Sequence, residues 1–165
     1  MSAETSRLPC LRLVAFDVDG VFTDGRFYLS DDGVESKSFH TQDGFGVRRL
    51  IEAGIDVAVI SGRKSGAVEK RMTELGVQHV VQGCRDKVAA LSDICSALGI
   101  ELADCAYAGD DIPDLPLLDA VGFSIAVANA VPAVRDSCNY TTTQRGGSGA
   151  VREICELVIA ARTDA

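Results

Sequence analysis

Aspartates gather at two places in the sequence where an apolar run has just ended, after 11–16 and after 105–108. The members of the two groups are Asp17, Asp19, Asp110, Asp111 and Asp114. Neighbouring carboxylates repel one another unless a cation lies among them, and oxygen ligands without His or Cys suit a hard ion such as Mg²⁺. A carboxylate can also attack phosphorus and form an aspartyl-phosphate. The pattern therefore indicates metal-assisted phosphoryl transfer to water.

Each residue has a definite task in that interpretation. Asp17 is the candidate nucleophile, and Asp19 could protonate the leaving oxygen and later deprotonate water. Ser61 can hydrogen-bond phosphoryl oxygens, and Lys87 can neutralise charge in the transition state. Taken alone, either aspartate group is more often a turn or a helix cap, and capping is one role open to Asp114. The hypothesis depends on the order and spacing of the separate motifs.

The elements that must position these residues alternate between apolar runs and segments of helical periodicity. That alternation predicts an α/β fold with a parallel sheet flanked by helices. Strands are expected at 11–16, 57–60, 79–81, 105–108 and 123–127, and helices at 68–75, 88–98 and 151–158. Loops at the carboxyl ends of parallel strands converge on one crevice. Ser61, Arg63, Lys87 and both aspartate groups should therefore meet there.

One segment breaks the alternation. Residues 26–39 surround Asp32-Gly33, which predicts a β-hairpin. Since it directly follows the first aspartate pair, it is either decoration or a lid and docking surface over the site. The sequence contains no linker or repeat, so we expect a single domain over 1–165.

The overall charge restricts the possible partners. Sixteen Lys and Arg against 24 Asp and Glu give a net charge of −8, which disfavours binding to nucleic acid or to an anionic membrane surface. The apolar runs are too short to span a membrane, and the N-terminal segment lacks the apolar core of a signal peptide. The six cysteines show no CxxC spacing, so reduced thiols and a cytoplasmic protein are expected.

The motifs resemble the haloacid dehalogenase superfamily of phosphotransferases. The resemblance is carried by DVDG at 17–20, SGR at 61–63, Lys87 and GDDIPD at 109–114. A closer resemblance, to the capless branch of 3-deoxy-D-manno-octulosonate (KDO) 8-phosphate phosphatases, extends from about 11 to 160. It adds DVDGVFTDG at 17–25, DGFGV at 43–47, ISGRKS at 60–65, AYAGDDIPDLP at 106–116 and GGSGAVRE at 146–153.

This resemblance implies a Rossmann-like sheet with a hairpin insertion and no cap domain. It implies a Mg²⁺ site made by Asp17, the backbone carbonyl of Asp19, and Asp110, with Asp111 and Asp114 orienting the metal's waters. Asp17 would be the nucleophile, Asp19 the acid and base, and Ser61 and Lys87 the phosphate holders. Substrate contacts are implied at Asp19, His40, Thr41, Gln42, Asp43, Gly44, Arg48, Arg63, Arg71 and Lys87.

The implied activity is hydrolysis of KDO 8-phosphate in a homo-oligomer, a tetramer with the hairpins at its centre and neighbouring subunits closing the site. Relatives that act on nine-carbon, sialate-type 9-phosphates resemble the chain almost as well, but tend to lack the arginine found here as Arg63. A second alternative is an inactive oligomerisation module linked to nucleotide-sugar synthesis. The retained Asp17, Asp19, Lys87 and Asp110 argue against it. For Arg48 and Arg71, a solvated helix face is the competing interpretation.

Overall fold

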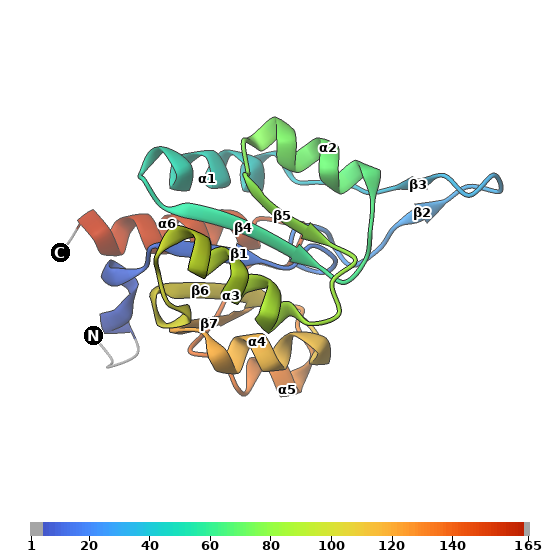
Figure 1. Cartoon of the computed structure of the whole chain (residues 1–165). Helices are drawn as coiled ribbons and strands as arrows, with labels where there is room; N and C mark the ends of the chain where they lie inside the picture. Colours follow the sequence, from blue (N-terminus) through green and yellow to red (C-terminus); the bar gives the residue numbers. More distant parts are fainter. Residues whose placement is uncertain (1–4, 164–165) are drawn as a thin grey trace.

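Six parallel strands form the centre of the computed structural model, which describes residues 5–163 (Figure 1). Their order across the sheet is β5-β4-β1-β6-β7-β8. The strands are β1 (Leu13–Phe16), β4 (Asp56–Ser61), β5 (His79–Gln82), β6 (Cys105–Gly109), β7 (Phe123–Ala126) and β8 (Tyr140–Thr141). Every residue of β1 and β6 is buried, as expected for strands that helices cover on both faces.

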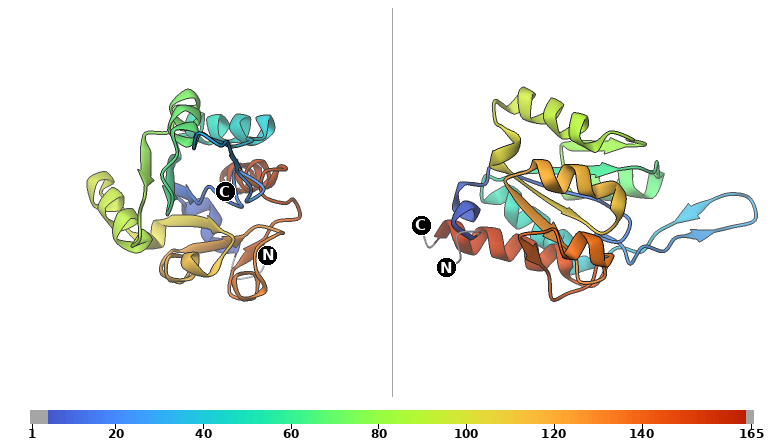
Figure 2. Two further views of the ribbon diagram at one scale, coloured as in Figure 1. Left: turned by 90° about the vertical axis from the view of Figure 1, so that its right-hand side faces the viewer. Right: turned by 90° about the horizontal axis from the view of Figure 1, so that it is seen from below.

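Helices α1 and α6 pack against each other on one face of the sheet, and α3 and α4 cover the other face (Figure 2). The α-helices are α1 (Thr41–Glu52), α2 (Gly66–Leu75), α3 (Lys87–Leu98), α4 (Leu115–Ala120), α5 (Pro132–Arg135) and α6 (Ala150–Thr163). Short 3₁₀ helices lie at η1 (Thr5–Cys10), η2 (Leu102–Asp104) and η3 (Ile112–Asp114). In the described part of the chain, no helix is long and apolar enough to cross a membrane.

The α/β fold expected from the sequence is confirmed, with small shifts at the ends of the elements. The first strand begins at Leu13 rather than at residue 11, and the last helix continues to Thr163. The apolar and helical periodicity of the sequence did not predict the strand β8 or the helices α4 and α5. These elements have two, six and four residues, which is too short for a periodic signal.

Helix α1 was missed for a different reason. Gly44 and Gly46 lie in its first half, and glycine is a poor helix former. The tertiary contact with α6 explains Gly46, because a Cβ there would lie 3.0 Å from Arg152 Cδ and 3.2 Å from Cys155 Cβ. The glycine lets the two helices approach closely.

The predicted hairpin is present and projects from the body as an arm (Figures 1 and 2). Its strands, β2 (Tyr28–Leu29) and β3 (Glu35–Ser36), are antiparallel and shorter than the sequence pattern indicated. Several large apolar side chains of the arm are exposed: Phe27, Tyr28, Leu29 and Val34. The arm leaves the sheet after β1, at the edge where the candidate site residues lie.

The α1–α6 contact generates a stability prediction. Gly46→Ala should lower the free energy of unfolding by about 1–3 kcal/mol, because the added methyl group overpacks the helix interface. Gly66→Ala in α2 is the matched control, since a Cβ at Gly66 meets nothing within 4 Å, and it should be neutral or slightly stabilising. Urea unfolding measures both, and equal midpoints for the two variants would contradict the packing argument.

Candidate active site

The two aspartate groups meet at the carboxyl edge of the sheet because β1 and β6 are neighbours in register. Phe16 pairs with Ala108, and the N–H of Asp17 donates to the Ala108 carbonyl at 2.9 Å. A pocket of about 500 Å³ opens at this point. Its lining residues are Asp17, Asp19, Gly25, Ser61, Gly62, Arg63, Cys84, Arg85, Lys87, Asp110, Asp111, Pro113 and Asp114.

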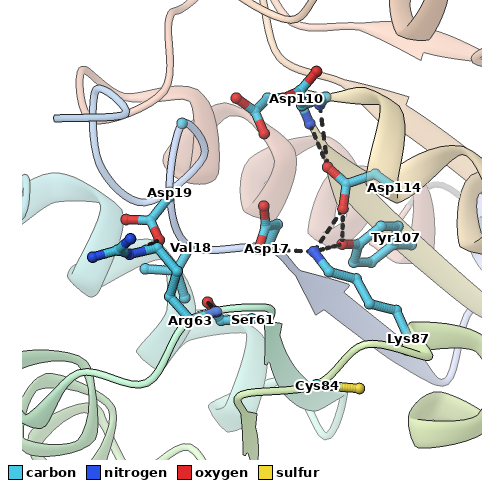
Figure 3. Close-up of polar contacts among 12 residues, drawn as sticks. Asp17, Val18, Asp19, Ser61, Arg63, Cys84, Lys87, Tyr107, Asp110 and Asp114 are labelled. Atoms are coloured by element: carbon cyan, nitrogen blue, oxygen red, sulfur yellow. Dashed lines mark hydrogen bonds and ion pairs between the residues drawn. The ribbon is translucent and has the colours of Figure 1, made fainter.

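A buried lysine lies at the bottom of this pocket (Figure 3). The Lys87 ammonium is 3.0 Å from Asp17 Oδ1 and 2.7 Å from Asp114 Oδ1, and it donates to the Tyr107 hydroxyl at 3.1 Å. Burial lowers the pKa of Lys87, but the charges of Asp17 and Asp114 outweigh that effect and leave the pKa above its ordinary value. Lys87 therefore remains a cation beside the Asp17 carboxylate at neutral pH.

Asp114 organises the loop that follows β6. Its Oδ1 accepts from Lys87 and from the Tyr107 hydroxyl at 2.6 Å. Its Oδ2 accepts from the backbone N–H groups of Asp110 at 2.9 Å and Asp111 at 3.2 Å. Both oxygens are therefore committed to protein donors, so Asp114 supports the site rather than offering an oxygen to a ligand.

Asp17 and Asp110 are the carboxylates best placed for a metal ion. One oxygen of each lies within 4.8 Å of the other and of an Asp114 oxygen. Burial, followed by repulsion from neighbouring carboxylates, raises the pKa of Asp17 to about 6 and that of Asp110 to about 7. A divalent cation between them would relieve this repulsion, and the all-oxygen donor set suits Mg²⁺. The residues present therefore fit a magnesium site.

The Asp19 carboxylate is turned toward Arg63 and away from Asp17 (Figure 3). It forms an ion pair with Lys37, whose side chain is completely buried at the base of the hairpin, and it lies 3.9 Å from Arg63 Nε. Arg63 in turn donates to Glu35 at 2.6 Å and lies 4.3 Å from the centre of the Phe27 ring. These contacts join the hairpin base to the pocket, so the arm is more than decoration.

Ser61 ends β4 at the same edge and is only 2% exposed. Its Oγ accepts from the Arg63 N–H at 3.3 Å. Among the described residues its hydroxyl donates no hydrogen bond, so the proton is available to an anion in the pocket.

The remaining predicted substrate contacts lie outside this pocket. We call them the α1–α2 group: His40, Thr41, Gln42, Asp43, Gly44, Arg48 and Arg71. Arg48 donates to the backbone carbonyl of Glu74 at 3.0 Å, and Arg71 donates to the carboxylate of Glu74 at 2.8 Å. Asp43 is buried, which raises its pKa, and accepts from the Arg152 N–H at the start of α6. Within one protomer, Asp43 therefore has a structural contact.

The glycine run 146–149 lies against the loop that follows β1. Gly146 donates to Asn129 Oδ1 at 2.6 Å, and Asn129 donates to the Gly20 carbonyl at 3.0 Å. A Cβ at Gly146 would lie 1.7 Å from the Gly20 oxygen. In the structure the run supports the loop that holds Asp17 and Asp19.

Among the residues at the site for which the sequence predicted no role are Lys37, Arg85, Tyr107 and Asn129. Tyr107 had a usable signal, because a phenol inside a fully buried strand needs a hydrogen-bond partner. Lys37 and Asn129 had none, since they reach the site from the hairpin base and from the loop after β7.

Comparison with known proteins agrees with this geometry. Residues 80–154 match the haloacid dehalogenase-like hydrolase family. The KDO 8-phosphate phosphatase KdsC of Escherichia coli K12 is 43% identical over 152 residues, which are 92% of this chain and 81% of the relative. The chain belongs to the KDO 8-phosphate phosphatase family of haloacid dehalogenase-like hydrolases.

Solved structures of this phosphatase family have the same fold. The crystal structure from Yersinia pestis has a TM-score of 0.96 and 41% identity, covering 98% of this chain and 88% of that one. The enzyme from Moraxella catarrhalis, solved with magnesium, phosphate and KDO, has a TM-score of 0.96 and 43% identity, covering 99% and 94%. The expected superfamily and branch are thus confirmed.

The raised pKa values of Asp17 and Asp110 generate a prediction for the metal. Between the unfolded pKa of about 4 and the raised values, the folded metal-free protein binds more protons than the unfolded chain, so its stability falls as pH rises through that window. Mg²⁺ binds the deprotonated carboxylates. The rise in Tm on adding Mg²⁺ should therefore be larger at about pH 8 than at about pH 5.5.

Thermal unfolding with and without Mg²⁺ at the two pH values measures this difference. Asp110→Asn is the matched control and should lose most of the response at both. An equal Mg²⁺ response at the two pH values would contradict the assignment of Asp17 and Asp110 as the carboxylates that the ion neutralises.

Proposed function

We propose that this protein hydrolyses KDO 8-phosphate to KDO and inorganic phosphate, with Mg²⁺ as cofactor and an aspartyl-phosphate on Asp17 as intermediate. The observation that carries the proposal is the Asp17 carboxylate held beside the buried Lys87 ammonium at the bottom of the pocket, next to Asp110. The Moraxella catarrhalis relative, whose structure contains magnesium, phosphate and KDO, supports the substrate and the metal.

The side chains divide the reaction between them. An Asp17 oxygen attacks the phosphorus, and Ser61 and Lys87 bind the phosphoryl oxygens as charge shifts onto them. Asp19 gives its proton to the leaving C8 oxygen, which releases KDO. Asp19 then takes a proton from water, and the resulting hydroxide attacks the aspartyl-phosphate, freeing phosphate and restoring Asp17.

The Asp19 side chain must turn before it can transfer this proton to the leaving oxygen, because Lys37 and Arg63 hold its carboxylate away from Asp17. Asp17, Asp110 and the backbone carbonyl of Asp19 would hold Mg²⁺, which neutralises charge on the phosphoryl group when bound. Asp111 and Asp114 support this set, Asp114 through its bonds to the Asp110 and Asp111 amides.

The α1–α2 group serves the pocket of a neighbouring protomer in this proposal. Its residues lie outside the pocket of their own chain, and the exposed apolar side chains of the arm offer a surface on which copies can assemble. A cytoplasmic homo-oligomer, a tetramer with the arms at its centre, would supply both a closed site and the additional arginines Arg48 and Arg71.

Phosphate release tests the proposal, with KDO 8-phosphate and a nine-carbon sialate-type 9-phosphate each assayed with Mg²⁺ and with chelator. The eight-carbon ester should be preferred and its turnover lost with chelator. Asp17→Asn should lower kcat by about 1,000-fold or more, because the nucleophile is gone. Asp56→Asn, an exposed carboxylate at the start of β4, is the control. Preference for the nine-carbon ester would keep the mechanism and overturn the substrate.

The arm generates a separate prediction. Replacing Tyr28 and Leu29 together by Asp places charge on the exposed apolar surface and should lower the mass measured by light scattering. The value of kcat/KM for KDO 8-phosphate should fall about 10-fold more than that for a carboxylate-free phosphate ester, because the α1–α2 group of the neighbour is lost.

Ile51→Asp is the control, since Ile51 is a partly exposed apolar residue outside the arm, and it should keep the wild-type mass. An unchanged mass in the arm variant, or an equal loss for both substrates, would contradict the assembly proposed.

A further inference from the structure

In the described part of the chain three cations line the pocket, and only one of them has no partner. Lys87 is paired with Asp17 and Asp114, and Arg63 is paired with Glu35 and Asp19 as described above. Arg85 forms no hydrogen bond, ion pair or ring contact with any described residue. Its guanidinium is therefore free to bind an anion that enters the pocket.

Arg85 lies at the mouth of the pocket rather than at its reactive end. It belongs to the loop between β5 and α3, two residues before Lys87, and it is exposed whereas Lys87 and Ser61 are buried. The phosphoryl group must lie at the bottom, within reach of Asp17, Ser61 and Lys87. The pocket volume of about 500 Å³ leaves room for the rest of a small ligand to extend toward Arg85.

The charges of the lining favour such a cation near a second anionic group. Five aspartates and three cations line the pocket in residues 5–163, and the chain as a whole has a net charge of −8. An anionic group near the mouth meets repulsion from this field unless a placed cation offsets it. A guanidinium donates two parallel hydrogen bonds to a carboxylate, which a lysine ammonium cannot match.

We propose that Arg85 is a specificity-determining residue that binds the carboxylate of the sugar-acid phosphate while its phosphoryl group lies against Asp17. The proposal rests on the proposed function, because it takes the ligand to be a phosphate ester with a second anionic group. It assigns to this chain a substrate contact in addition to Arg63 and the α1–α2 group.

Steady-state kinetics of the full-length protein with Mg²⁺ tests this assignment on two substrates, KDO 8-phosphate and arabinose 5-phosphate, a sugar phosphate without a carboxylate. Arg85→Ala should raise KM for KDO 8-phosphate about 10-fold and change kcat little, while leaving KM for arabinose 5-phosphate unchanged. Arg85→Lys should recover part of the loss, since it keeps the charge and loses the fork.

Arg12→Ala is the matched control, because Arg12 is an exposed arginine just before β1, at the opposite edge of the sheet. It removes the same charge and should change neither KM. A KM for KDO 8-phosphate in Arg85→Ala equal to that of Arg12→Ala overturns the proposal. An equal rise in KM for both substrates also overturns it, by assigning Arg85 to the phosphoryl group.

Wild-type turnover separates this proposal from the proposed function. Failure of the wild type to hydrolyse KDO 8-phosphate in the presence of Mg²⁺ overturns the proposed substrate. In that case Arg85 is tested with the nine-carbon sugar-acid 9-phosphate or, where that ester is not hydrolysed either, by calorimetric titration of KDO itself. Loss of carboxylate-dependent binding in Arg85→Ala supports the contact, and unchanged binding overturns it.

Discussion

The buried ion pair between Lys87 and the two carboxylates of Asp17 and Asp114 is the interaction on which the site depends. An ammonium taken out of water is costly unless its donors are satisfied, and here Asp17, Asp114 and the Tyr107 hydroxyl satisfy them. The same contacts hold β1, β6 and α3 together, because Asp17 directly follows β1, Tyr107 lies in β6 and Lys87 begins α3. One set of interactions therefore determines both the local packing and the position of the Asp17 carboxylate.

Asp114 extends this order to the metal site. By accepting two backbone N–H groups it fixes the turn at Asp110 and Asp111, so the Asp110 carboxylate faces Asp17 across a short gap. Burial, followed by repulsion between neighbouring carboxylates, raises the pKa values of Asp17 and Asp110. The Asp17 and Asp110 carboxylates therefore repel each other at the point where a divalent cation would relieve that repulsion.

Much of this could be predicted from the sequence, because the aspartate motifs follow buried strands whose apolar runs are unambiguous. Strand order and register then place Asp17 beside Asp110 with little freedom. What could not be predicted depends on contacts between distant segments. The glycine at position 46 is explained by the close approach of α6. Asn129 is explained by its hydrogen bond to the Gly20 carbonyl, and Lys37 by its ion pair with Asp19. Neither residue type nor spacing records those contacts.

The hairpin base shows how specificity can be built without a cap domain. Lys37 and Arg63 hold Asp19, and Glu35 holds Arg63, so a change in the position of the arm changes the partners of Asp19. The apolar side chains of Phe27, Tyr28, Leu29 and Val34, on either side of the polar turn of the arm, are exposed, and they are the surface on which the proposed assembly would form. In that assembly, contacts on the arm would act on the site through Asp19, whereas Lys87 and Asp114 are buried beneath the sheet edge and, among the described residues, have no contact with the arm. A change in the arm should therefore affect the steps that depend on Asp19 more than it affects the position of Asp17, which Lys87 fixes.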